Sequence, residues 1–94
     1  MKIVTVCGMG FGTSLMVKMT IDDILNEIGF EAEVEASDVG SVKGKDADLV
    51  VSSAEMRHQL SDLESDVIFL NNMADKEEIR EKLLAYLKEK GELR

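Results

Sequence analysis

Three short apolar runs, separated by stretches with helical periodicity, constrain the fold of this chain more than any other feature. The runs are KIVTV (2–6), ADLVVSS (47–53) and DVIFL (66–70). They are rich in β-branched residues, and we predict that each is a buried strand. A further segment, EAEVEA (31–36), alternates charged with apolar residues, as a strand near a sheet edge does. Buried strands that alternate with helices predict a parallel sheet covered on both faces.

Helical periodicity fills the longer stretches between and after these runs. One apolar face begins near Ser14 and ends before Gly29, a natural helix stop; it comprises Val17, Ile21, Ile24, Leu25 and Ile28. Asp75 with Glu78 predicts the start of a last helix that Gly91 ends, with Ile79, Leu83, Tyr86 and Leu87 on its inner face. Ser52 with Glu55 forms a capping box, which predicts a short helix over about 53–62 whose apolar positions are Met56, Leu60 and Leu63.

The link SDVGSVKGKD (37–46) is rich in turn residues, and we predict a loop there without a helix. The expected fold is therefore α/β, a single open three-layer domain over residues 1–94. Its sheet has four parallel strands in the order 2-1-3-4, with helices on both faces and right-handed crossovers.

Charge and composition exclude several classes of partner. The net charge is −8, which disfavours nucleic acid and direct docking on anionic lipid. No apolar run approaches the roughly 20 residues of a membrane span, so we expect no membrane insertion. Cys7 is the only cysteine, which excludes an internal disulfide and fits a cytoplasmic location. We expect no cofactor and no metal, because one cysteine and His58 lack partners at ligand spacing, and we interpret His58 as a surface residue.

The loop CGMGFGTS (7–14), directly after the first strand, is the candidate site. Ligands of such sheets bind beyond the carboxyl ends of the strands, where the strand order reverses. Its three glycines allow the backbone amides to approach and surround an anion, and the following helix directs its positive end there. A phosphate-sized dianion above Cys7 is favoured, and the pKa of the thiol is expected below its usual value of about 8.5. The structural alternative is a buried cysteine beside a tight turn.

The spacing Cys7-x5-Thr13 is that of the cysteine phosphatase loop, but Thr13 stands where that loop has an arginine. The bidentate clamp on the phosphoryl oxygens is therefore missing. Asp75 is the nearest candidate general acid, and it is already expected to cap a helix. A dinucleotide site, with Asp38 as its ribose-binding acid, would need a different glycine spacing. The loop is thus suited to accepting a phosphoryl group and poorly equipped to hydrolyse it, which is typical of a carrier.

The run VCGMGFGTSLMVKM resembles the phosphocysteine loop of the enzyme IIB components of the bacterial phosphoenolpyruvate-dependent sugar phosphotransferase system. It looks most like the ascorbate-specific and next the galactitol-type members of the lactose-type group, and KMTIDDIL and DADLVVSS extend the resemblance. This implies that Cys7 is phosphorylated. It also implies a phosphate-binding loop made of Gly8, Met9, Gly10, Phe11, Gly12, Thr13 and Ser14.

The same resemblance implies two protein partners. A IIA phosphocarrier donates the phosphoryl group from a phosphohistidine, and a membrane-embedded IIC permease holds the sugar, ascorbate, that receives it. The protein would then be cytoplasmic and would associate with the inner face of the membrane through IIC. A galactitol- or other sugar-specific IIB component is the alternative, and a low-molecular-weight cysteine phosphatase-like protein is a remoter one.

The methionines near the loop allow two interpretations. Met16 and Met19 fall away from the face formed by Val17, Ile21 and Ile24. Methionines at helical spacing are more often part of a core, whereas an exposed apolar rim beside the site would suit docking to two partners in turn. The sequence leaves both interpretations open.

Overall fold

The structure of the chain, a computed structural model, describes residues 1–6 and 11–92. The strands are β1 (Lys2–Val6), β2 (Glu33–Ser37), β3 (Leu49–Ser53) and β4 (Asp66–Leu70). The helices are α1 (Phe11–Ile28), the four-residue α2 (Val39–Val42), the 3-10 helix η1 (Ala54–Met56) and α3 (Lys76–Glu89). Among these described residues no helix is both long and apolar enough to span a membrane.

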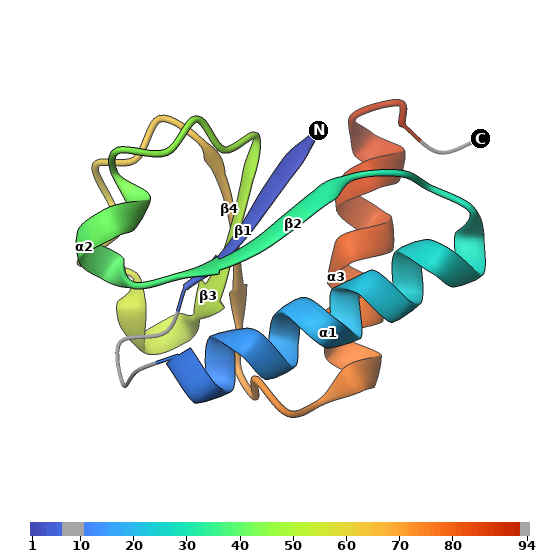
Figure 1. Ribbon diagram of the computed structural model, residues 1–94, viewed down its shortest axis with the longest axis horizontal. Coiled ribbons are helices and arrows are strands. Elements are labelled where there is room, and N and C mark those ends of the chain that lie inside the picture. Colours follow the sequence, from blue (N-terminus) through green and yellow to red (C-terminus); the bar gives the residue numbers. More distant parts are fainter. Residues whose placement is uncertain (7–10, 93–94) are drawn as a thin grey trace.

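The four strands form one parallel sheet in the order β2-β1-β3-β4, which confirms the predicted topology (Figure 1). Strands β1 and β4 have the predicted bounds, whereas β2 and β3 each begin two residues later than predicted. At the start of β3 the chain is held to β1 by two hydrogen bonds. Lys2 N donates to the Asp48 carboxylate (2.7 Å) and Asp48 N donates to Lys2 O (2.8 Å). The strand order places β1 inside the sheet, between β2 and β3.

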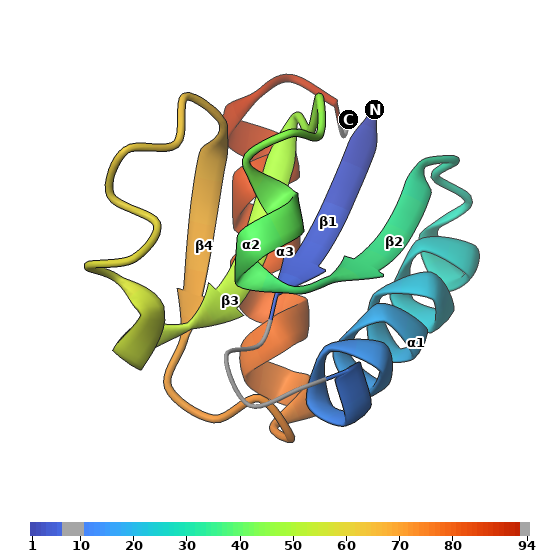
Figure 2. The same ribbon diagram turned by 60° about the vertical axis from the view of Figure 1, so that its left-hand side comes forward.

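Helices α1 and α3 cover one face of the sheet, and α2, η1 and the turns after η1 lie on the other (Figures 1 and 2). The first layer packs on Ile3, Leu49, Val51 and Leu70 of the strands, and the second packs on Val4, Val6 and Val50. Successive side chains of a strand point to opposite faces of the sheet, and both of these sets are buried, as the apolar runs predicted.

The predicted ends of both long helices are confirmed. Gly29 (φ 71°) and Gly91 (φ 75°) have left-handed backbone conformations that favour glycine. After α1, Phe30 N donates to Leu25 O (3.0 Å) and Gly29 N to Asn26 O (3.3 Å), the hydrogen bonds of a Schellman motif. At the start of α3, the Asp75 carboxylate accepts from the N–H groups of Glu77 (3.1 Å) and Glu78 (3.2 Å).

Three predictions on local structure were wrong. The link 37–46 contains the short helix α2, because the Asp38 carboxylate accepts from Ser41 N (2.7 Å) and caps it. The helix predicted over 53–62 is only η1 followed by turns, since the Ser52 hydroxyl that should cap it donates instead to Val6 O in the sheet. Helix α1 begins at Phe11, not near Ser14, so Phe11, Gly12 and Thr13 belong to its first turn.

Candidate functional site

The candidate site lies at the carboxyl edge of the sheet. The interior strand β1 ends at this edge with Val6, the residue before Cys7 in the sequence, and α1 begins at Phe11 on the same side. The predicted site residues Cys7, Gly8, Met9 and Gly10 lie outside the described residues. Phe11 and Gly12 open α1, Thr13 is half-buried and Ser14 is fully buried in its first turn.

The start of α1 is electrostatically suited to an anion. The helix has 18 residues, and its first turn contains no acidic side chain that would compete for its N–H groups. A helix N-terminus carries a partial positive charge and N–H groups that intrahelical hydrogen bonds leave available to a ligand. The first turn of α1 can therefore help to bind a phosphoryl group on the residues that precede it.

A cleft lies at the same edge, between the ends of β3 and β4. It is lined by Ser53, Ala54 and Glu55 on one side and by Leu70, Asn71, Asn72 and Met73 on the other. Glu78 of α3 holds the wall formed by residues 70–73. Its carboxylate accepts hydrogen bonds from Asn71 N (2.7 Å), Asn72 N (2.9 Å) and Lys82 Nζ (2.8 Å). These contacts, led by the Lys82 hydrogen bond and then that of the Asn71 amide, lower the pKa of Glu78 to about 2.

Asp75 and Asp38, the candidate general acid of a phosphatase and the candidate ribose-binding acid, each cap a helix. Asp75 caps α3, as predicted, and so its carboxylate is already engaged by two helix amides. Asp38 caps α2, and the hydrogen bond from the Ser41 amide lowers the pKa of its carboxyl group. Neither arrangement favours the phosphatase general acid or the ribose-binding acid that the sequence raised.

The second and third turns of α1 present an apolar surface to solvent. Leu15, Met16 and Met19 are 49%, 53% and 59% exposed, whereas Val17 and Ile21 on the other side of the helix are buried. The two methionines therefore do not belong to the core. We call Leu15, Met16 and Met19 the apolar rim; its members lie one to five residues after the site residue Ser14 in the same helix.

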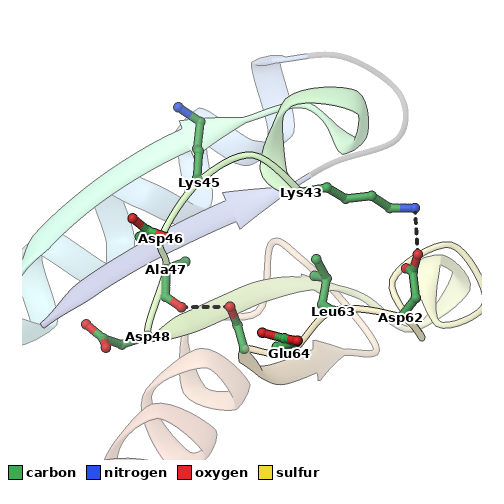
Figure 3. A pocket seen from close by; sticks show the side chains of 9 residues that line it. Lys43, Lys45, Asp46, Ala47, Asp48, Asp62, Leu63 and Glu64 are labelled. Carbon is green, nitrogen blue, oxygen red and sulfur yellow. Dashed lines mark hydrogen bonds and ion pairs between the residues drawn. The ribbon is translucent and has the colours of Figure 1, made fainter.

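A second hollow lies at the opposite, amino edge of the sheet (Figure 3). Its cations are engaged by carboxylates: Lys43 pairs with Asp62 (3.1 Å) and Lys45 with Glu35 (2.7 Å). His58 is exposed, as predicted, and lines a shallow hollow beside α2. Within residues 1–6 and 11–92 no group of three histidine, aspartate or glutamate side chains is placed to hold a metal ion.

Sequence reasoning missed four residues that shape this edge. Leu15 belongs to the rim, Glu78 anchors the cleft wall, and the buried hydroxyls of Thr5 and Ser52 bond to backbone carbonyls next to the loop. Thr5 stands out in the sequence as the one polar residue between Ile3 and Val6, a signal that could have identified it. Nothing in the sequence shows that Ser52 faces the sheet instead of capping a helix.

Comparison with known proteins agrees with this arrangement. The family model of the lactose/cellobiose-specific IIB subunit of the phosphotransferase system (PTS) matches residues 2–85. A Mycoplasma pneumoniae protein named ascorbate-specific PTS system EIIB component is 31% identical over 86 residues, which are 88% of this chain and 90% of that protein. A protein of the same name from Shigella dysenteriae serotype 1 is 30% identical over 91 residues, which are 94% of this chain and 90% of that protein.

The fold has a solved counterpart. The lactose-specific IIB domain of the phosphotransferase system from Streptococcus pneumoniae superposes with a TM-score of 0.67 at 17% identity, over 94% of this chain and 95% of that one. PTS IIB components are phosphotransferases, and the family model spans nearly all of the sheet and helices described above. The chain therefore belongs to the lactose/cellobiose-specific IIB subunit family of the bacterial phosphotransferase system.

Proposed function

We propose that this protein is a IIB phosphocarrier that accepts a phosphoryl group on Cys7 from the phosphohistidine of a IIA partner and passes it to a sugar. The observation that supports this most is where the elements on either side of the loop begin and end. The interior strand β1 ends at Val6, the residue before Cys7 in the sequence, and α1 begins at Phe11. Residues 1–94 act as one carrier domain in this proposal. The phosphoryl oxygens are held by Gly8, Met9, Gly10, Phe11, Gly12, Thr13 and Ser14.

Both transfer steps are displacements at phosphorus. In the first, the Cys7 thiolate attacks phosphorus, an S–P bond forms, and the P–N bond breaks with its electron pair going to the histidine ring. In the second, a sugar hydroxyl attacks and its proton passes to water, an O–P bond forms, and the S–P bond breaks to return the thiolate. The positive end of α1 favours the thiolate before transfer and the phosphoryl dianion after it.

The same loop favours transfer over hydrolysis. Thr13 supplies one neutral hydroxyl where a cysteine phosphatase has a guanidinium that stabilises attack on the phosphoenzyme. Asp75, the candidate general acid, is held as the cap of α3. A phosphocysteine in this setting keeps its phosphoryl group until an acceptor hydroxyl is presented.

We infer that the sugar is ascorbate, because two relatives that align over about nine-tenths of their length are named ascorbate-specific components. The sugar itself would be held by a membrane-embedded IIC permease. This places the protein in the cytoplasm, at the inner face of the membrane when it is bound to IIC. Galactitol is the competing substrate to test.

The apolar rim contributes to the surface that the IIA donor covers. Transfer requires the donor histidine to reach Cys7, so the donor must lie across the carboxyl edge of the sheet. Leu15, Met16 and Met19 are exposed in the second and third turns of α1, the helix that begins at that edge. Burial of such side chains stabilises association by roughly 25 cal/mol for each Å² of apolar surface removed from water.

The test is intact mass spectrometry after incubation with phosphoenolpyruvate, the general phosphotransfer proteins and the cognate IIA protein. We expect a gain of about 80 Da, the mass of one phosphoryl group, and no gain for Cys7→Ser. A gain of the same size in Cys7→Ser would refute the assignment of the phosphorylated residue. Membrane vesicles containing IIC, supplied with labelled ascorbate or galactitol, then identify the sugar. Phosphorylation of galactitol alone would contradict the ascorbate assignment.

A further inference from the structure

We infer that the buried hydroxyls of Thr5 and Ser52 are positioning groups that hold the two ends of the loop bearing Cys7. The inference rests on the proposed phosphorylation of Cys7 and adds the residues that orient it. Neither residue touches the phosphoryl group in this inference. Each acts through a backbone carbonyl next to the loop.

Ser52 acts at the entrance of the loop. It is the register partner of Val6 between β3 and β1, and its Oγ donates to Val6 O at 2.9 Å. Both residues are completely buried. The carbonyl carbon of Val6 is bonded to the nitrogen of Cys7, so this hydrogen bond fixes the peptide group that leads into the nucleophile.

Thr5 acts at the far end of the loop, from the other face of the sheet. Its Oγ donates to Ser14 O in the first turn of α1 at 2.8 Å, and both residues are completely buried. This bond ties the strand that precedes the loop to the helix that follows it. Together the two hydroxyls fix both ends of the connection between Val6 and Ser14.

Apolar side chains lie beside these hydroxyls on both faces of the sheet. Ile3 and Val51 lie on the face to which Thr5 belongs, and Val4 and Val50 lie on the face to which Ser52 belongs. Valine would fill the space of Thr5 without a buried polar atom, and burying a hydroxyl lowers stability unless a hydrogen bond offsets the cost. What the hydroxyls add to apolar packing is a fixed direction for two carbonyls. Displacement at phosphorus needs that direction, because misplacing a nucleophile by about 1 Å can slow a reaction by about 100-fold.

The test compares Thr5→Val and Ser52→Ala with Thr5→Ser, which keeps the hydroxyl, and with Ser65→Ala as a matched control. Ser65 Oγ donates to Ala47 O at 2.7 Å, which is also a hydroxyl-to-carbonyl bond, but Ser65 directly precedes β4 at the opposite edge of the sheet. Unfolding midpoints are measured first, and all rates are taken well below the lowest midpoint. The two readouts are the rate of Cys7 phosphorylation by phosphorylated IIA and the rate of Cys7 alkylation by iodoacetamide against pH.

We expect Thr5→Val and Ser52→Ala each to slow phosphorylation by roughly 2- to 13-fold, the factor for one neutral hydrogen bond, and to change the alkylation profile. Thr5→Ser should stay near the wild type. Ser65→Ala, whose hydrogen bond is only partly buried, should lose less stability and keep wild-type rates in both assays. Wild-type rates and profiles in Thr5→Val and Ser52→Ala would overturn the inference. If the wild type is not phosphorylated at all, the proposed function fails, and the alkylation profiles alone still decide whether these hydroxyls position Cys7.

Discussion

Glu78 allows a quantitative test of how the carboxyl edge is held together. Replacing Glu78 by glutamine keeps the size of the side chain and removes its charge. In the native protein this carboxylate accepts hydrogen bonds from Lys82 Nζ and from the amides of Asn71 and Asn72. Glutamine has a single acceptor oxygen, and its amide group would face N–H donors. We therefore expect Glu78→Gln to weaken the wall of the cleft.

The size of the effect follows from the pKa of Glu78, which falls from 4.5 to about 2 mainly because of the Lys82 hydrogen bond. At about 1.4 kcal/mol per pKa unit, this shift sets an upper limit of about 3.5 kcal/mol. Lys82 is 38% exposed, so solvent screening reduces that limit. We expect Glu78→Gln to lower the free energy of unfolding by about 1–2 kcal/mol at neutral pH.

The pH dependence has a definite sign. Because the folded pKa lies below the unfolded one, the carboxylate stabilises the fold fully above about pH 4.5, and this contribution is lost as the pH falls toward 2. Urea unfolding at pH 7 and pH 3 measures it, with Glu81→Gln, an exposed carboxylate on the same helix, as the control. The difference in free energy of unfolding between the wild type and Glu78→Gln should be smaller at pH 3 than at pH 7. A difference that is the same at both pH values would refute the reasoning. So would an equal loss of unfolding free energy in Glu78→Gln and Glu81→Gln at pH 7.

Three further predictions concern the loop and its rim. Alkylation of Cys7 by iodoacetamide should have a midpoint below about pH 8.5 because the thiol precedes a helix N-terminus, and a midpoint at or above that value would contradict it. Thr13→Val should slow phosphorylation by roughly 2- to 13-fold through loss of one neutral hydrogen bond, and wild-type activity on p-nitrophenyl phosphate should be near background. Robust hydrolysis would favour a phosphatase, and an unchanged Thr13→Val rate would remove Thr13 from the site. Met16→Gln and Met19→Gln should raise the KM for phosphorylated IIA without changing Cys7 alkylation, and an unchanged KM would exclude the rim from docking.

Much of the architecture follows from local patterns in the sequence. The apolar runs at 2–6 and 66–70 are strands with the predicted bounds, since short runs rich in β-branched residues favour an extended backbone. Gly29 and Gly91 end helices where predicted because their positive φ angles disfavour other residues. Asp75 caps α3 because its carboxylate bonds to amides only two and three residues away. These features depend on neighbours in the chain.

The tertiary structure decided what depends on distant residues. Ser52 has the sequence context of a helix cap, yet its hydroxyl faces β1, which is 46 residues away, and donates to Val6 O. The segment after it forms only one 3-10 turn, held in place by burial of Met56 and Leu60 on the sheet. Sequence periodicity indicated that Met16 and Met19 lie off the buried face of their helix. Only the packing of α1 against α3 and the sheet decided that this side meets solvent, because exposure depends on which elements cover a helix and not on the helix alone.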